Sequence, residues 1–165
     1  YHTVDYQLMS LASIPPVELE LLPPGLEMGQ ALPEETNAIL PLQEGYEKEE
    51  VIPPGDVFDR TACKANLARS IEKQKIYLVR AQGRPVAKAG TNARAFACDQ
   101  LGGVYTAPEW RNKGLATALV AKISRELAAD GRTVVLFVKK GNEAAKKAYE
   151  KVGFTPESSY AITYF

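Results

Sequence analysis

The spacing of apolar residues changes near residue 113, and this change constrains the fold more than any other feature of the chain. Four apolar side chains recur at intervals of four residues, as in an amphipathic helix: Leu115, Leu119, Ile123 and Leu127. Asp130-Gly131 is a helix stop signal. The continuous apolar run Thr133–Val138 then predicts a strand covered on both faces. A long helix followed by a buried strand requires a sheet with helices packed against it.

Further helices and strands are expected on either side of this unit. Asn142 can cap a helix that continues to about Lys151 and is closed by Gly153. Asp59 can cap an earlier helix that continues to about Glu72. Three strand candidates joined by tight turns lie in between and favour antiparallel pairing: Ile76–Ala81, Pro85–Ala89 and Ala95–Thr106.

The N-terminal part of the chain is rich in proline and less regular. Two runs alternate in the manner of strands, Val4–Met9 and Val17–Leu21. Pro33, followed by two acidic residues, predicts the first turn of a helix that should be interrupted or restarted at Pro41. The order of all these elements predicts an α/β fold, a mixed sheet with helices on both faces.

The composition is that of one globular domain. The 165 residues are 45% apolar and 24% charged, which are ordinary values for a packed chain. No apolar run approaches the roughly 20 residues of a membrane span. No secretory leader is visible, although the chain starts at Tyr1 and a lost leader stays open. Cys63, Cys98 and His2 are too few for the usual zinc site, so we expect no metal and a cytoplasmic protein with two free thiols.

The net charge of zero conceals an asymmetry between the two parts of the chain. Residues 1–59 hold twelve of the twenty acidic residues and one of the twenty basic ones, which leaves eight acids and nineteen bases in residues 60–165. Such a distribution can separate a site for a cationic partner from a site for an anionic one. It is equally compatible with simple solvated faces.

The loop before the long helix has the chemistry of an anion site. The strand that ends at Thr106 leads through this loop into the helix, where the first free backbone N–H groups and the helix dipole favour an anion. Gly114 lets a phosphate approach the backbone, and Arg111 and Lys113 add positive charge. Neither a Gly-Lys-Ser/Thr sequence nor a GxGxxG pattern is present. A glycine at a helix start is, by itself, also compatible with a purely structural turn.

The residues around this loop closely resemble the coenzyme A-binding motif of the GNAT acetyltransferase superfamily. The core pattern Gln/Arg-x-x-Gly-x-Gly/Ala is matched by Arg111, Gly114 and Ala116, and Pro108–Arg111 matches the approach to it. Downstream, Asn142–Phe154 is similar to the second motif of the family, Asn-x-x-Ala-x-x-x-Tyr-x-x-x-Gly-Phe. The resemblance is strong over residues 76–165 and only topological over residues 17–73.

The resemblance implies a GNAT fold with antiparallel N-terminal strands and a V-shaped splay between the fourth and fifth strands. It implies acetyl-CoA as co-substrate, with its pyrophosphate on the N–H groups of residues 112–117 and its pantetheine arm along Val104–Thr106 as an added strand. An N–H near Val104 or Tyr105 would stabilise the oxyanion. The implied coenzyme-binding residues are Val104, Tyr105, Thr106, Arg111, Asn112, Lys113, Gly114, Leu115, Ala116, Thr117, Asn142, Ala145 and Tyr149.

Catalytic residues are implied less completely. The family's tyrosine, here Tyr149, protonates the departing thiolate, although its ring could equally be packed against the sheet. Gln100 stands where some family members carry a carboxylate, and strand alternation points Asp99 to the opposite face. Candidate bases therefore come from the acidic segment expected to rim the acceptor pocket, which contains Glu44, Glu47, Glu49 and Glu50. We take Glu44 and Glu49 as the two candidates, each of which also fits a solvated surface acid.

We expect an acetyl-CoA-dependent N-acetyltransferase that acts on a primary amine, on a small molecule or a protein, by direct attack in a ternary complex. The alternative is a non-catalytic acyl-CoA-binding or regulatory module, and a larger acyl group also stays open. We expect no nucleic-acid partner and no membrane partner. Coenzyme binding does not discriminate between enzyme and module, whereas turnover does.

The beginning of the chain carries a separate expectation. Tyr1–Leu11 looks like the last strand of a GNAT unit, much as Ser158–Phe165 does. We expect residues 1–11 to be a strand left from a preceding GNAT-like half, or one that pairs in a tandem or a homodimer. Residues 12–165 then form the acetyltransferase domain. The alternative is an extra edge strand of the same domain.

Overall fold

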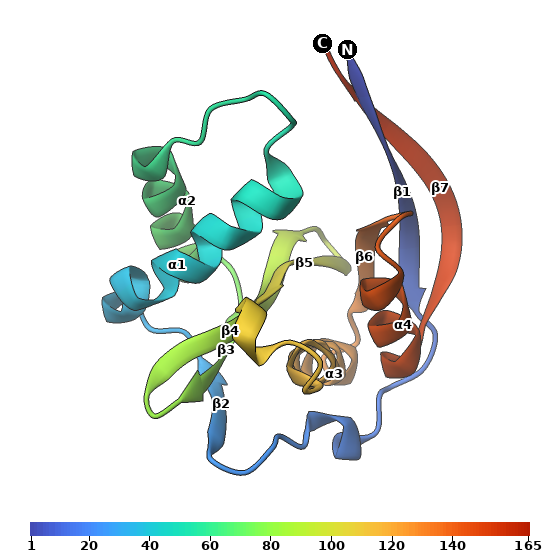
Figure 1. The fold of residues 1–165 in the computed structure, drawn as a ribbon. Coiled ribbons are helices and arrows are strands. Elements are labelled where there is room, and N and C mark those ends of the chain that lie inside the picture. The colour runs from blue at the N-terminus through green and yellow to red at the C-terminus, as the bar shows by residue number, and fades with distance from the viewer.

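A computed structural model describes residues 1–165 and contains one sheet of seven strands in the order β2-β3-β4-β5-β6-β1-β7 (Figure 1). The strands are β1 His2–Leu11, β2 Leu26–Gln30, β3 Ile76–Ala81, β4 Arg84–Arg94, β5 Cys98–Thr106, β6 Thr133–Lys139 and β7 Phe154–Tyr164. Neighbouring strands are antiparallel except for β5 and β6, which are parallel. The sheet is therefore mixed, as the sequence predicts.

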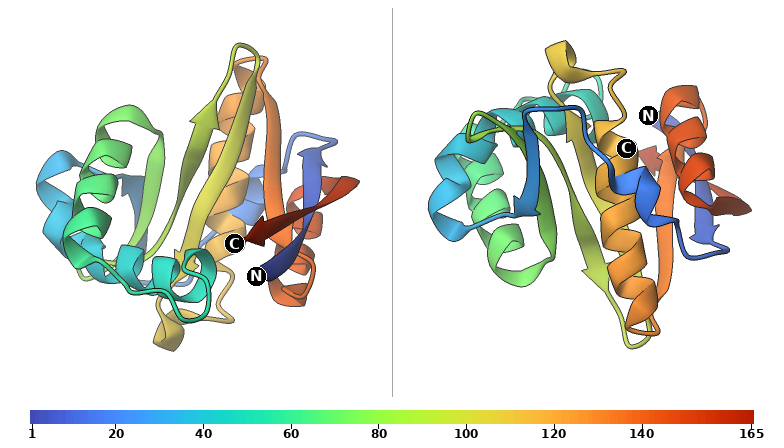
Figure 2. Two further views of the ribbon diagram at one scale, coloured as in Figure 1. Left: turned by 90° about the horizontal axis from the view of Figure 1, so that it is seen from above. Right: turned by 90° about the horizontal axis from the view of Figure 1, so that it is seen from below.

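Helices cover both faces of the sheet (Figure 2). The α-helices are α1 Thr36–Tyr46, α2 Arg60–Lys73, α3 Leu115–Ala129 and α4 Glu143–Val152. Short turns are η1 Val17–Glu20, η2 Pro33–Glu35, the π-helical η3 Glu47–Val51 and η4 Pro108–Trp110. Helices α1 and α2 pack on one face around Ile39, Leu67 and Leu78, and α3 and α4 pack on the other. The predicted α/β architecture with helices on both faces is confirmed.

Local features of the sequence account for most element boundaries. Asp59 caps α2, its carboxylate accepting a hydrogen bond from the Ala62 N–H at 3.0 Å. Asn142 caps α4 in the same way, and Gly153, with φ +119°, closes that helix. These caps lie where the sequence places them.

Several expected boundaries were wrong. Val17–Leu21 does not form a strand: residues 17–20 make a 3₁₀ turn that packs on α3, because the prolines before it hold the chain out of the sheet. Pro41 does not interrupt α1, since its ring lies on the exposed side of the helix, where water can satisfy the carbonyl that lacks a partner.

The strand boundaries and coverage also differ from expectation. The strand expected over Pro85–Ala89 extends over the whole of β4, and the strand expected from Ala95 begins at Cys98 because a bend occupies the residues in between. β2 was not expected at all. The run Thr133–Val138 is not covered on both faces, because the Phe137 side chain is 37% exposed.

The two parallel strands separate along their length. β5 pairs with β6 only over Cys98–Leu101, opposite Thr133–Leu136. Beyond this point Gly102–Thr106 of β5 and Phe137–Lys139 of β6 make no pairs with each other. We call this pair of diverging segments the V. Helix α3 begins at its open end and finishes near its closed end, so that the helix N-terminus lies beside the unpaired strand edges (Figure 2).

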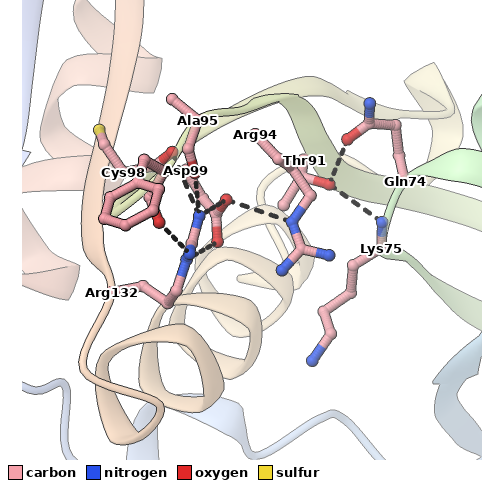
Figure 3. Close-up of polar contacts among 9 residues, drawn as sticks. Gln74, Lys75, Thr91, Arg94, Ala95, Cys98, Asp99 and Arg132 are labelled. Atoms are coloured by element: carbon pink, nitrogen blue, oxygen red, sulfur yellow. Dashed lines mark hydrogen bonds and ion pairs between the residues drawn. The ribbon is translucent and has the colours of Figure 1, made fainter.

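A buried carboxylate holds the closed end of the V (Figure 3). Asp99 at the start of β5 is fully buried and accepts two hydrogen bonds from Arg132, at 2.7 and 2.9 Å, and one from Arg94 at 3.1 Å. Arg132 also donates to the carbonyls of Ala95 and Phe96. Burial alone would raise the pKa of Asp99, but the guanidinium groups of Arg132 and Arg94 outweigh it and lower this pKa. The carboxylate therefore joins β4, β5 and the α3–β6 loop.

The first strand lies inside the sheet. β1 pairs with β6 through Tyr6–Ser10 and with β7 along its whole length, so that the two chain ends lie side by side (Figure 1). Met9 of β1 is fully buried in the core under α3 and α4. The alternative of an extra edge strand was wrong, because β7 and not β1 forms the edge.

No helix in the structure has both the length and the apolar character needed to cross a membrane.

The arginine cluster gives a stability prediction. Arg132→Met leaves Asp99 buried with Arg94 as its one remaining cation, so we expect a loss of about 3–5 kcal/mol in the free energy of unfolding. Arg94→Met is the matched control: its side chain is 43% exposed, and we expect a loss of about 1 kcal/mol or less. Urea denaturation measures both. Equal losses for the two variants would contradict the structural role assigned to Arg132.

Candidate functional site

The loop between β5 and α3 presents a row of free backbone donors. The N–H groups of residues 112–117 make no hydrogen bond within the protein, and no side chain caps α3. Asn112 and Gly114 have φ values of +62° and +77°, which turn the chain sharply into the helix. Leu115 is buried in the core and anchors the helix start. Free donors, the positive helix end and Lys113 together form an anion site.

Arg111 does not point freely into this loop. Its Nε donates to the Thr106 carbonyl at 3.0 Å, and its Nη2 forms an ion pair with Glu49 at 3.0 Å. Its guanidinium also lies 5.3 Å from the centre of the Tyr105 ring. The Tyr105 hydroxyl donates to the same Glu49 carboxylate at 3.1 Å. Glu49 of η3 is therefore bound to both the anion loop and β5.

The η3 segment spans the open end of the V. Glu49 binds Arg111 on the β5 side, while Glu50 forms an ion pair with Lys139 at the end of β6, at 3.2 Å. Both carboxylates are partly exposed. An acidic turn is thus placed across the gap between two strands whose backbone edges are unpaired.

β5 contains a bulge at the open end of the V. Gly102 lies opposite Gly90 and Tyr105 opposite Lys88, so that Gly103 and Val104 together face a single residue of β4. Gly103 has φ +62°, the left-handed value that glycine permits at such a bulge. A bulge re-aims backbone groups out of the ladder, and here it does so where β5 no longer pairs with β6.

Tyr149 projects from α4 into the same region. Its side chain is 8% exposed, and its ring packs edge-on against Phe154 at 6.3 Å. Burial, with smaller contributions from Tyr46 and Glu50, raises the pKa of Tyr149 well above its usual value. The phenol therefore stays protonated at neutral pH.

The other expected site residues divide into two groups. Val104, Ala116, Thr117 and Ala145 are half-buried near the loop and the V. Glu44, in contrast, forms an ion pair with Arg60 of α2 at 2.6 Å and a longer one with Lys48. The structure brings Glu49 to the loop and engages Glu44 with α2. Gln100 lies within the paired part of β5, between Ala93 and Val135.

A cavity of about 440 Å³ opens beside the V. One wall comes from η3 and the segment after it, including Glu49, Glu50 and Phe58, and the other from the strands through Tyr6, Lys139 and Tyr164. Of the four acids expected to rim an acceptor pocket, Glu49 and Glu50 line this cavity, whereas Glu44 and Glu47 do not.

Sequence reasoning did not single out three residues of this region. Gly103 carried a signal, since two adjacent glycines within a strand indicate a bulge. Tyr46 and Lys88 meet beneath that bulge, with the Lys88 ammonium 4.8 Å from the ring centre. The sequence gives no indication of this contact, because it joins α1 and β4.

Comparisons with known proteins agree with this geometry. A family model described as FR47-like protein matches residues 77–162, which is just over half of the chain. A search of curated proteins found no match. A solved structure assigned to the GNAT acetyltransferases, from Novosphingobium aromaticivorans, is 24% identical, with a TM-score of 0.74 over 97% of this chain and 63% of its own. A GNAT-family acetyltransferase from Colwellia psychrerythraea is 18% identical, with a TM-score of 0.75 over 98% of this chain and 56% of its own.

A third solved structure contains a ligand. It is a predicted acetyltransferase from Clostridium acetobutylicum with acetyl-CoA, 15% identical, with a TM-score of 0.64 over 79% of this chain and 90% of its own. At these identities the solved structures establish the fold. The chain spans about half to two thirds of the length of most of its structural neighbours.

The Glu49–Arg111 pair gives a binding prediction. Glu49→Gln removes the carboxylate that occupies Arg111, so the affinity of the loop for a diphosphate probe such as ADP should rise by about 1.5- to 5-fold, the worth of one exposed ion pair. Glu50→Gln removes the same charge from the same turn but frees Lys139 instead, and should have the smaller effect. Titration calorimetry measures both. Equal gains in affinity for the two variants would show that the effect comes from the net charge of the turn and not from the release of Arg111.

Proposed function

The chain belongs to the FR47-like family, and with it to the GNAT superfamily, and from this premise we propose that it is an acetyl-CoA-dependent N-acetyltransferase. The observation that carries the proposal is the row of six free N–H groups at residues 112–117 beside the unpaired edge of β5. These donors fit the pyrophosphate of coenzyme A, and the open V fits a pantetheine arm that pairs like an added strand. The bound acetyl-CoA would supply the acetyl thioester.

Within this proposal, the residues of the loop bind and those of β5 and α4 act on the reacting atoms. Arg111, Lys113 and the N–H groups up to Thr117 hold the pyrophosphate, while Asn142 and Ala145 border the pantetheine arm. A backbone N–H at Val104 or Tyr105 donates to the carbonyl oxygen as it becomes an oxyanion. The bulge at Gly103 supports this role because it turns backbone groups away from β4.

The transfer requires three proton movements. The ammonium group of the acceptor first gives a proton to the base, and the free amine nitrogen then attacks the carbonyl carbon. The nitrogen loses a second proton to solvent as the carbon–sulfur bond breaks. Tyr149 gives its proton to the departing sulfur and is later reprotonated from solvent. A phenol that stays protonated because burial raises its pKa is suited to that role. Of the two candidate bases we favour Glu49, because it lines the cavity and Glu44 does not.

The acceptor is proposed to be a primary amine that enters through the cavity beside η3. Its acidic rim attracts an ammonium group, and its volume of about 440 Å³ accommodates a small molecule or a lysine side chain. We also propose a cytoplasmic setting, in which Cys63 and Cys98 remain the free thiols that they are in the structure.

A screen tests the function directly. The protein is incubated with acetyl-CoA and a panel of amines and polyamines, lysine peptides included, and acetylated products are detected by mass spectrometry. We expect a product with the native chain and none with Gly114→Glu, whose carboxylate occupies the anion site and whose side chain is strained at φ +77°. A chain that binds acetyl-CoA but acetylates nothing in the panel would favour a non-catalytic acyl-CoA-binding module.

Tyr149→Phe separates chemistry from binding. The ring and its packing remain, so coenzyme affinity should change less than about twofold, while turnover should fall by roughly 10²- to 10⁴-fold, as for loss of a general acid. Rapid-quench kinetics with the best amine and calorimetry with coenzyme A measure the two quantities. Unchanged turnover would show that the ring is there for packing.

We further propose that residues 1–11 fill a strand position that a neighbouring unit can share, as a remnant of a preceding GNAT-like half or as an exchange partner in a tandem or homodimer. The support is that β1, first in sequence, lies between β6 and β7. Ser10 and Val135 lie directly opposite each other. Cysteines at both positions should cross-link within one chain in a monomer and between two chains in an exchanged dimer. Monomers alone on a denaturing gel, at all concentrations, would reject the homodimer.

A further inference from the structure

A buried lysine lies directly behind the bulge of β5. Lys88 is 5% exposed, and its Nζ donates to the Gly103 carbonyl at 2.7 Å. The ring of Tyr46 lies over this ammonium at 4.8 Å, and no carboxylate lies within ion-pair distance of it. Burying an ammonium group without an ionic partner is costly. A buried ammonium group at this position therefore needs a structural or functional reason.

The peptide unit that Lys88 contacts, between Gly103 and Val104, gives such a reason. The Gly103 carbonyl and the Val104 N–H belong to the same planar trans peptide, so they point in opposite directions. Holding the carbonyl oxygen fixes the whole plane and points the N–H away from Lys88. A cation on the oxygen also polarises the unit, which makes the N–H a stronger hydrogen-bond donor.

The surroundings keep the lysine in this position. A Cβ at Gly103 would lie 3.0 Å from the Lys88 Nζ, so a side chain there would crowd the ammonium and shift it by a few tenths of an ångström. Gly103 also needs its φ of +62°, which other residues adopt at a cost. Gly103 thus leaves its carbonyl accessible, and Lys88 donates to that carbonyl.

We propose that Lys88 is a positioning residue that orients and polarises the Gly103–Val104 peptide so that its N–H stabilises the oxyanion during acyl transfer. This inference rests on the proposed function, in which a backbone N–H at Val104 or Tyr105 receives the thioester oxygen. It names the peptide that does so and the side chain that supports it from the opposite side.

Infrared spectroscopy of bound acetyl-CoA tests the proposal without an acceptor amine. With the acetyl carbonyl labelled with ¹³C, the isotope-edited stretch of the bound thioester should lie below that of free acetyl-CoA, because a strong donor lengthens the C=O bond. Lys88→Met keeps the unbranched apolar part of the side chain, one atom shorter, but removes the charge and the hydrogen bond. We expect most of the downshift to be lost, with the ratio of Kd for coenzyme A to Kd for acetyl-CoA falling by about 2- to 10-fold, the worth of one hydrogen bond.

The matched control is Lys122→Met, which makes the same change on α3, where Lys122 pairs with Glu126 and touches neither the loop nor the bulge. Both the stretch and the Kd ratio should remain as in the native chain. A Lys88→Met variant that binds acetyl-CoA with the native stretch would overturn the proposal. A native chain that does not bind acetyl-CoA would instead overturn the proposed function, so the two failures are distinguishable.

A second measurement needs no variant and so remains decisive if Lys88→Met does not fold. Burial lowers the pKa of Lys88 to about 8, against the opposing charge of Glu47. The other titratable groups that face it are Tyr46 of α1 and Cys63 of α2, and burial raises the pKa values of both. The native downshift should therefore shrink as the pH rises through about 8 and the ammonium loses its proton. A downshift that stays constant from pH 6 to pH 10 would overturn the proposal.

Discussion

The interaction on which the rest of the structure depends is the short parallel pairing of β5 and β6, which stops at Leu101 and Leu136. Every buried backbone N–H and C=O group needs a hydrogen-bond partner. Two strands that separate inside a sheet therefore leave groups that must bind something other than each other. Helix α3 starts beside the open end, and its first N–H groups are equally without partners. At this site the fold thus leaves backbone hydrogen-bonding groups without partners.

Such an opening has to be stabilised elsewhere, and the closed end of the V does this. Asp99 is fully buried, yet it is acceptable there because two arginines and a dense set of hydrogen bonds surround it. Arg132 ties together the start of β5, the hairpin before it and the loop that leads into β6. The closed and open ends of the β5–β6 pair therefore differ in how their polar groups are paired. At the closed end a buried carboxylate is paired with two arginines, whereas at the open end backbone N–H groups are left without partners.

The parts that the sequence predicted are those set by neighbours in the chain. The stripe from Leu115 to Leu127, the caps at Asp59 and Asn142, and the glycine loop before α3 depend on residues within a few positions of one another. They appear in the structure as expected. The row of free N–H groups at residues 112–117 follows from the same local patterns, because consecutive backbone groups at a helix start depend only on neighbours in the chain.

What the sequence did not predict depends on contacts between distant segments. The insertion of β1 between β6 and β7 follows from pairing across more than 120 residues, and alternation alone cannot show which neighbours a strand takes. The partner of Arg111 could not be read from its motif either, since Glu49 lies 62 positions earlier. Lys88 looked like an ordinary strand lysine, and its burial becomes visible only when α1 covers β4.

The charge asymmetry of the chain takes on a more specific meaning in the fold. The acidic N-terminal part does not form a separate face: η3 carries Glu49 and Glu50 across the open V to Arg111 and Lys139, which belong to the basic part. Carboxylates therefore occupy a cation beside the anion loop and another at the end of β6. A diphosphate that enters the loop competes with Glu49 for Arg111, and the carboxylate that it releases lies in the wall of the neighbouring cavity. Binding of an anion at one side of the V would in this way supply a free negative charge at the side where a cationic amine would enter.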